Sequence, residues 1–210
     1  MKQYAQYPES KQHYYAVVTS MDEQMGRLRK TLRERGIAGN TMIWFCSDNG
    51  PSRLRVSQRC QGITGPYRDR KGSLYEGGIR VPGILEWPAM VKPGRVTRAA
   101  AVTSDYFPTI LELLKLPVPH DNPLDGLSLV PVIKGEWIKR PAPIGFVFYK
   151  RFAWNDDRYK LLSVDNGETY ELYDLRTDPG ESVNVIAEHP DLAARMEREL
   201  TQWRLGLRAD

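Results

Sequence analysis

The run Thr41-Met42-Ile43-Trp44-Phe45-Cys46-Ser47-Asp48-Asn49-Gly50 sets the interpretation of the whole chain. An apolar segment rich in β-branched and aromatic residues ends abruptly in an acid, an amide and a glycine. This pattern is typical of a buried parallel strand that delivers polar groups to the carboxyl edge of an open α/β sheet, where such sheets place their chemistry. Asp48 and Asn49 offer hard oxygen donors of the kind that Ca²⁺ or Mg²⁺ selects. The alternative is a simple turn, because Asp-Asn-Gly is also ordinary turn chemistry.

Segments on both sides of this run favour an α/β fold. Apolar residues recur at helical spacing within residues 12–35, which predicts an amphipathic helix that stops at Gly36. A helix followed by a strand is the repeating unit of a doubly wound, mostly parallel sheet. The pattern predicts further elements at 79–87 (strand), 106–114 (helix, with Ser104 or Asp105 as its cap) and 127–134 (short helix).

The carboxyl-terminal third has a different pattern. Three short β-like runs, at 144–149, 159–164 and 170–175, are joined by polar turns and predict a small antiparallel sheet. The segment 190–207 predicts a helix that packs across this sheet through Leu192, Met196, Leu200 and Trp203. We therefore expect two domains, covering residues 1–138 and 139–210.

Composition excludes several classes of protein. Of the 210 residues, 41% are hydrophobic and 27% charged, which excludes disordered and fibrous classes. The net charge of +4 comes from scattered basic residues, so nucleic-acid binding is not indicated and an anionic small substrate fits as well. No apolar run has the length of a membrane span, and the first residues lack a signal-peptide apolar core, so we expect no membrane span and no export signal in this chain.

The loop between residues 51 and 78 is a second candidate for function, because long loops inside compact domains usually carry it. It is rich in glycine, which allows close approach of the backbone to a ligand. Arg68, Arg70 and Lys71 lie within four residues and could receive an anion.

Four stretches, taken together in their order and spacing, resemble the sulfatase family of the alkaline phosphatase superfamily. The closest similarity is to the arylsulfatase and N-acetylgalactosamine-6-sulfatase-like branch. The stretches are Met21 to Leu28, Phe45 to Gly50, Gly72 to Pro82, and Glu171 to Leu175 continuing through Asp178-Pro179 and Glu181 to Asn184.

The resemblance implies roles for particular residues. Asp48 and Asn49 look like the second pair of ligands of the active-site Ca²⁺, for which Mg²⁺ is a possible substitute. Lys71 looks like the catalytic lysine that contacts the substrate sulfate, and a compact ammonium suits a tetrahedral oxyanion. Without the resemblance, a lysine in a polar loop is a solvated charge. Arg80 is expected either to meet the substrate or, more in keeping with its position, to form a structural ion pair, and Glu76 is expected to fix the loop by hydrogen bonds.

Other parts of the family pattern are absent from this sequence. In sulfatases the nucleophile is a formylglycine made from the cysteine of a Cys-x-Pro-Ser-Arg motif. Neither Cys46 nor Cys60 has that context, and Asn49-Gly50-Pro51-Ser52-Arg53 has asparagine in the critical place. The paired aspartates expected as the first metal ligands are also absent. The resemblance therefore covers the end of the catalytic domain and the small carboxyl-terminal domain, with the amino-terminal half of the catalytic domain as the missing partner.

Three functions remain open. The first is hydrolysis of a sulfate ester of a carbohydrate or aryl alcohol, in a periplasmic or secreted full-length parent. The second is phosphoester or phosphonate hydrolysis, because the same oxyanion and metal geometry serves both. The third is a truncated, catalytically silent protein. In each case a parallel sheet without its leading strands should expose apolar surface, so we expect poor stability or association of the isolated chain.

Overall fold

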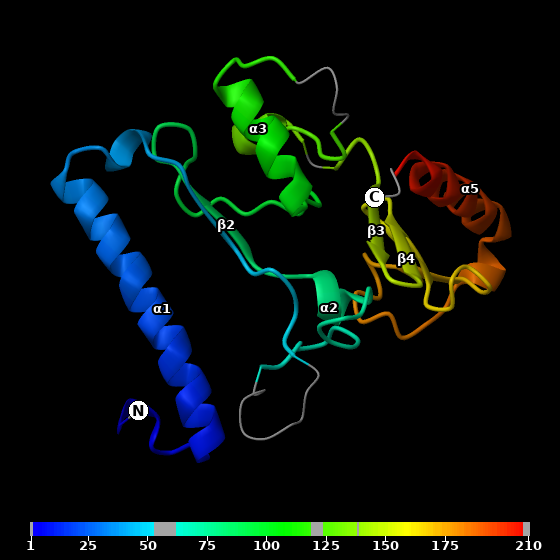
Figure 1. The fold of residues 1–210 in the computed structure, drawn as a ribbon, viewed down its shortest axis with the longest axis horizontal. Helices are drawn as coiled ribbons and strands as arrows, with labels where there is room; N and C mark the ends of the chain where they lie inside the picture. The colour runs from blue at the N-terminus through cyan, green and yellow to red at the C-terminus, as the bar shows by residue number, and fades with distance from the viewer. Residues whose placement is uncertain (1, 53–61, 119–123, 138, 208–210) are drawn as a thin grey trace.

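The computed structural model describes residues 2–52, 62–118, 124–137 and 139–207. It contains a long amino-terminal helix, a two-stranded sheet, a pair of short helices and a four-stranded sheet covered by the carboxyl-terminal helix. Figure 1 shows that the long helix stands apart from the four-stranded sheet, with the two-stranded sheet running between them.

Helix α1 spans Glu9–Glu34, after a short 3-10 turn at Lys2–Tyr4, and matches the prediction for this segment. It ends as expected at Gly36, whose φ of 70° is left-handed, and the Ile37 amide closes the end by donating to Leu32 O at 3.1 Å. None of the residues 9–34 of α1, all of them described, is buried. The apolar face of the helix is therefore only partly covered by the described part of the chain, as at Tyr15, which contacts the rings of Tyr4 and Tyr7.

Strand β1 spans Ile43–Cys46, after a 3-10 turn at Ala38–Asn40, and pairs with β2, which spans Gly83–Glu86. The pair is antiparallel, with Ile43 opposite Glu86 and Cys46 opposite Gly83. The expectation of a buried parallel strand is thus not met within the described residues, where β1 has this one antiparallel partner and is half-buried throughout. The helical turn α2, Glu76–Ile79, lies in the segment that returns the chain to β2 and was not predicted.

Helices α3, Tyr106–Leu113, and α4, Val130–Lys134, follow a 3-10 turn at Thr103–Asp105 and confirm the two helices expected here. Asp105 occupies the predicted N-cap position of α3, but its side chain makes no capping hydrogen bond there. Its buried carboxylate instead accepts hydrogen bonds from the amides of Val102 and Leu127 and a bidentate pair from Arg140 at 2.6 and 2.8 Å. Asp105 thereby ties together three segments that are distant in sequence.

The carboxyl-terminal sheet has the order β3-β4-β5-β6, and every neighbouring pair is antiparallel. The strands span Ile144–Phe148, Arg151–Asn155, Tyr159–Ser163 and Glu171–Asp174. Three of them were predicted, and β4 was missed. A 3-10 turn at Ile186–Glu188 leads into α5, Pro190–Gly206, the predicted final helix.

This sheet is covered on both faces. On one face α5 packs through Ala193, Met196 and Leu200 against side chains of β4, β5 and β6, as its apolar periodicity predicted. On the other face, Leu74 and Tyr75 pack against alternate residues of the same strands. The loop that precedes α2 is therefore part of the core of the carboxyl-terminal unit.

The predicted domain boundary falls between α4 and β3, where residue 138 lies outside the described residues, and it stays a prediction. No helix in the described ranges is long and apolar enough to cross a membrane.

Candidate active site

The tip of β1 meets the loop that carries Lys71 through the backbone. The amide of Gly50 donates to the carbonyl of Gly78 at 2.8 Å, and the amide of Lys71 donates to the carbonyl of Pro51 at 3.0 Å. A methyl group on Gly50 would overlap the carbonyl oxygen of Gly77. Glycine is required here because the two main chains touch with no side chain between them.

These contacts bring together the segments that carry three of the predicted site residues. Asp48 is exposed and Asn49 is half-buried at the end of β1, while Lys71 is exposed at the start of the facing loop. The amide nitrogen of Asn49 donates to the carbonyl of Gly50 at 2.9 Å, which leaves its side-chain oxygen for another partner. The segments that carry Asp48, Asn49 and Lys71 are thus joined through the backbone, and their roles in a site stay predictions.

A divalent cation would need ligands beyond this pair. Ca²⁺ takes six to eight oxygen ligands. The ranges that the structure describes contain no group of three or more His, Cys, Asp and Glu side chains that could hold a metal. The carboxylate of Asp48 and the amide oxygen of Asn49 could supply part of the ligand set of a hard cation. Cys60 and Arg53, which were compared with the nucleophile motif in the sequence, lie outside the described residues.

Arg80 lies in a structural arrangement. Its guanidinium is 3.3 Å from Oε2 of Glu76 and stacks over the ring of Tyr67 at 4.8 Å. This is the ion pair that its sequence position favoured. The described contacts of Arg80 therefore hold the loop, and its predicted contact with substrate stays a prediction.

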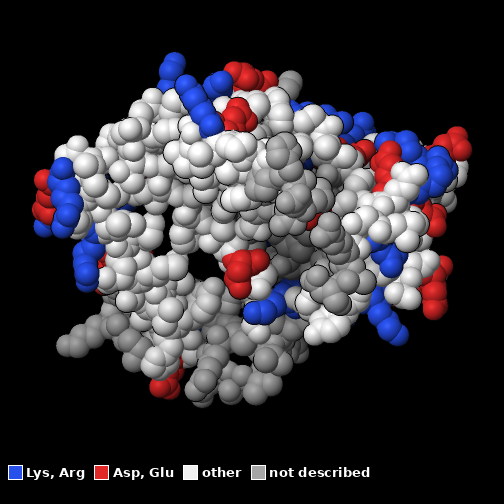
Figure 2. Space-filling model, turned by 45° about the horizontal axis from the view of Figure 1, so that its top comes forward, with Lys and Arg blue, Asp and Glu red and all other residues white. Residues whose placement is uncertain are grey.

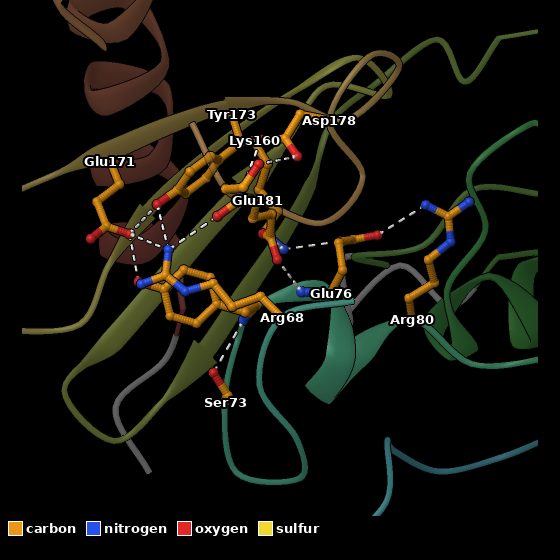
Figure 3. Close-up of polar contacts among 11 residues, drawn as sticks. Arg68, Ser73, Glu76, Arg80, Lys160, Glu171, Tyr173, Asp178 and Glu181 are labelled. Atoms are coloured by element: carbon orange, nitrogen blue, oxygen red, sulfur yellow. Dashed lines mark hydrogen bonds and ion pairs between the residues drawn. The ribbon is translucent and has the colours of Figure 1, made fainter. Parts of the chain in front are cut away.

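A buried ion network lies behind the loop (Figure 3). Lys160, from the middle of β5, is completely buried, and its ammonium is 2.9 Å from Oε1 of Glu76 and 2.6 Å from Oε1 of Glu181. Glu181 also accepts a hydrogen bond from the backbone amide of Glu76 at 2.6 Å. Burial raises the pKa of Glu181 above its ordinary value, against the opposing effect of the nearby Lys160 ammonium.

This network explains the role of Glu76. Its carboxylate is held by Lys160 inside and by Arg80 outside, so Glu76 fixes the turn at α2, as the sequence indicated. The burial of Lys160 was not predicted, because an isolated lysine in a short strand is normally solvated.

Arg68 belongs to an adjacent polar and aromatic cluster, and its side chain remains 43% exposed (Figure 3). Its guanidinium lies 3.9 Å above the ring centre of Tyr75 and donates to the hydroxyl of Tyr173 at 2.8 Å. Both tyrosine hydroxyls donate to Oε2 of Glu171, at 2.5 and 2.7 Å. Burial and these bonds raise the pKa of Tyr173 to about 12. The cluster fixes the loop from its amino-terminal side.

Charge on the surface is mixed. On the face drawn in Figure 2, basic and acidic side chains of the described residues are interspersed, and wide areas carry neither. That distribution differs from the basic stripe that nucleic-acid binding requires.

The fold and the loop of Lys71 first indicate a general class of protein, one with an alkaline-phosphatase-like fold. Solved structures similar to this chain include sulfatases with an alkaline-phosphatase-like fold and a phosphonate monoester hydrolase. One is Ps i-CgsB in complex with k-i-k-neocarrahexaose, with a TM-score of 0.82 and 28% identity over 94% of this chain and 44% of that one. Another is BT4656 in complex with its substrate D-glucosamine-2-N,6-O-disulfate, with a TM-score of 0.72 and 27% identity over 91% of this chain and 39% of that one.

Family models cover nearly the whole sequence. The model described as Sulfatase matches residues 2–116, and the model described as N-sulphoglucosamine sulphohydrolase, C-terminal, matches residues 67–205. The chain belongs to the sulfatase family.

Curated relatives agree with this assignment. A sulfatase of Formosa agariphila is 33% identical over 90% of this chain and 39% of its own length. The N-acetylgalactosamine-6-sulfatase of Mus musculus is 32% identical over 84% of this chain and 34% of its own length. The chain thus spans between about a third and two fifths of the length of these two curated relatives.

Proposed function

We propose that this chain supplies the carboxyl-terminal part of a sulfuric ester hydrolase, with Asp48 and Asn49 as metal ligands and Lys71 as the residue that contacts the sulfate. One observation carries the proposal. The backbone bonds from Gly50 to Gly78 and from Lys71 to Pro51 join the strand tip and the lysine loop into one unit. The substrate class is a sulfate ester of a carbohydrate or an aryl alcohol.

Lys71 acts through its charge. An exposed ammonium on a loop fixed by the backbone can bind a tetrahedral oxyanion and stabilise the negative charge that shifts between its oxygens during transfer. The fixed backbone matters because a preorganised cation needs no reorientation when the charge moves.

Asp48 and Asn49 would hold a divalent cation, Ca²⁺ or Mg²⁺, through one carboxylate and one amide oxygen. When bound, such a cation supplies charge neutralisation for the sulfate oxygens. The free side-chain oxygen of Asn49 supports this role. The formylglycine of the family would have to come from a segment outside this sequence, which contains no Cys-x-Pro-Ser-Arg motif.

Calorimetric titration of the chain with inorganic sulfate, with and without Ca²⁺, tests the assignment. Lys71→Ala should abolish sulfate binding, and Asp48→Ala should abolish its dependence on Ca²⁺. Lys92→Ala removes another exposed lysine and serves as the matched control. Sulfate binding that survives Lys71→Ala unchanged would remove Lys71 from the site.

Two other functions have support. The phosphonate monoester hydrolase of Agrobacterium radiobacter is similar in structure, with a TM-score of 0.66 and 26% identity over 91% of this chain and 40% of that one, so a phosphonate or phosphate ester is the second candidate. The absence of the nucleophile motif from this sequence supports a catalytically silent chain. Turnover assays on aryl sulfate, phosphate and phosphonate esters, run beside the binding titrations, separate the three.

A further inference from the structure

The turn between β3 and β4 presents two aromatic rings to solvent. Tyr149 is 85% exposed and Phe148 is 41% exposed. Their rings meet edge to face, with centres 4.7 Å apart and planes at 84°. Neither ring belongs to the two buried clusters that cover the sheet, so packing of the core does not account for them.

The backbone at Tyr149 is unfavourable for its residue type. Tyr149 begins a two-residue turn with a φ of 53°, in the left-handed region that glycine, asparagine and aspartate normally occupy in such hairpins. A bulky residue in this conformation costs conformational energy and points to a function of the side chain.

This turn lies against the loop of Lys71. The ring of Phe148 comes within 3.9 Å of the position that a side chain on Gly72 would occupy, in van der Waals range. Arg151, at the start of β4, donates a hydrogen bond to the carbonyl of Gly72. The turn is therefore fixed beside the residue that follows Lys71.

Charge and ring chemistry together identify a ligand. Lys150 in the turn and Lys71 in the adjacent loop are both exposed cations, which suits an anionic group. An exposed aromatic face with few rotatable bonds offers a rigid apolar surface, which suits the C–H face of a sugar ring. Two of the similar structures contain saccharides, k-i-k-neocarrahexaose and D-glucosamine-2-N,6-O-disulfate.

We propose that Phe148 and Tyr149 form a saccharide-binding subsite, in which the sugar ring of a sulfated saccharide lies on the aromatic turn while its sulfate group meets Lys71. The inference rests on the proposed function, because Lys71 defines the sulfate end of the subsite. It makes the substrate a sulfated sugar in preference to a simple aryl sulfate.

The test compares affinities of the 210-residue chain for N-acetylgalactosamine 6-sulfate, p-nitrophenyl sulfate and inorganic sulfate, each with Ca²⁺ present. Tyr149→Gly and Phe148→Ala should each weaken binding of the sugar sulfate about 3- to 10-fold and leave inorganic sulfate unchanged. Tyr149→Phe should retain sugar affinity because it keeps the ring. Phe107→Ala removes an exposed ring from α3 and should change nothing.

Tyr149→Gly is informative because glycine favours the left-handed backbone of this turn, so the variant should unfold at the same or a higher urea concentration. Loss of sugar affinity in a variant of equal or greater stability cannot come from unfolding. The inference is overturned if the wild-type chain does not bind the sugar sulfate, or if Tyr149→Gly leaves its affinity unchanged. It is also overturned if the affinity for inorganic sulfate falls equally in the variants, or if only the affinity for the aryl ester changes. Failure of the proposed function would be seen in a separate measurement, in which the Lys71→Ala substitution leaves sulfate binding unchanged.

Discussion

The two ends of this chain differ in how they are held together. In the carboxyl-terminal unit, both faces of the four-stranded sheet are covered, and Leu161, Leu172 and Met196 are completely buried. In the amino-terminal region, α1 contributes none of its described residues 9–34 to a core, and Ile84 of β2 is 59% exposed. The first region carries the stability, while Asp48 and Asn49 lie in the second. The loop of residues 68–80 belongs to both, because it packs on the sheet and bonds to the tip of β1.

The largest effect is expected at the link between the two regions. Lys160→Met leaves the buried Glu181 without its cation and Glu76 with Arg80 alone, which should cost about 3–5 kcal/mol of unfolding free energy. Urea unfolding followed by tryptophan fluorescence measures the loss, and Lys92→Met at an exposed site is the control. If both variants lose the same stability, the buried network does not hold the regions together.

Core truncation should separate the two regions directly. Met196→Ala removes a completely buried side chain of α5 and should cost about 2–5 kcal/mol. Leu28→Ala, at a position of α1 that is 45% exposed, should change the unfolding free energy by less than about 0.5 kcal/mol. A loss of stability at Leu28 as large as that at Met196 would show that the apolar face of α1 is covered in solution, and sedimentation analysis would then identify self-association as the cause.

A smaller effect is expected where the strand tip meets the loop. Gly50→Ala forces the backbone of β1 away from Gly77 and should cost about 1–3 kcal/mol, because a close-packed contact cannot absorb an extra methyl group. Hydrogen exchange should rise at the amides of Gly50 and Lys71, with Gly39→Ala, at an open position, as the control. Unchanged exchange at these two amides would contradict the backbone contact.

The smallest expected effect is on the stability of the protein at acidic pH. Hydrogen bonds from the hydroxyl and amide of Thr169, and from the hydroxyl of Ser163, lower the pKa of Asp165 to about 2. A carboxylate with a lowered pKa stabilises the fold above its ordinary pKa, near 4, and loses that contribution as the pH falls through about 2. Asp165→Asn should therefore flatten the stability curve between pH 4 and pH 2, measured by urea midpoints. An identical slope in the variant would mean that the turn after β5 is not responsible.

The strongest periodic segments were predictable from sequence. The helices α1, α3 and α5 follow local apolar spacing, and the face of α5 that packs on the sheet could be named in advance. Strand β4 was missed because the turn before it, Tyr149-Lys150, lacks the glycine or asparagine that marks a hairpin. The antiparallel pairing of β1 with β2 was not predicted, because the partner of a strand is decided by the tertiary fold and not by its own residues.

The residues of the candidate site also fall into a group that the sequence predicted and a group that it did not. Asp48, Asn49 and Lys71 were proposed from motifs and stay predictions, whereas Glu76 was rightly expected to fix the loop. The supporting residues were not found, since Lys160 and the Arg68 cluster depend on pairing between positions about 84 and 105 residues apart. Sequence patterns report local chemistry, and burial of a charge is a property of the assembled fold.

The glycine contact between positions 50 and 77 has one more consequence. Since peptide groups touch there directly, the spacing between the tip of β1 and the loop of Lys71 is independent of any rotamer. Side chains on either segment can then be exchanged while the distance between the two main chains stays the same.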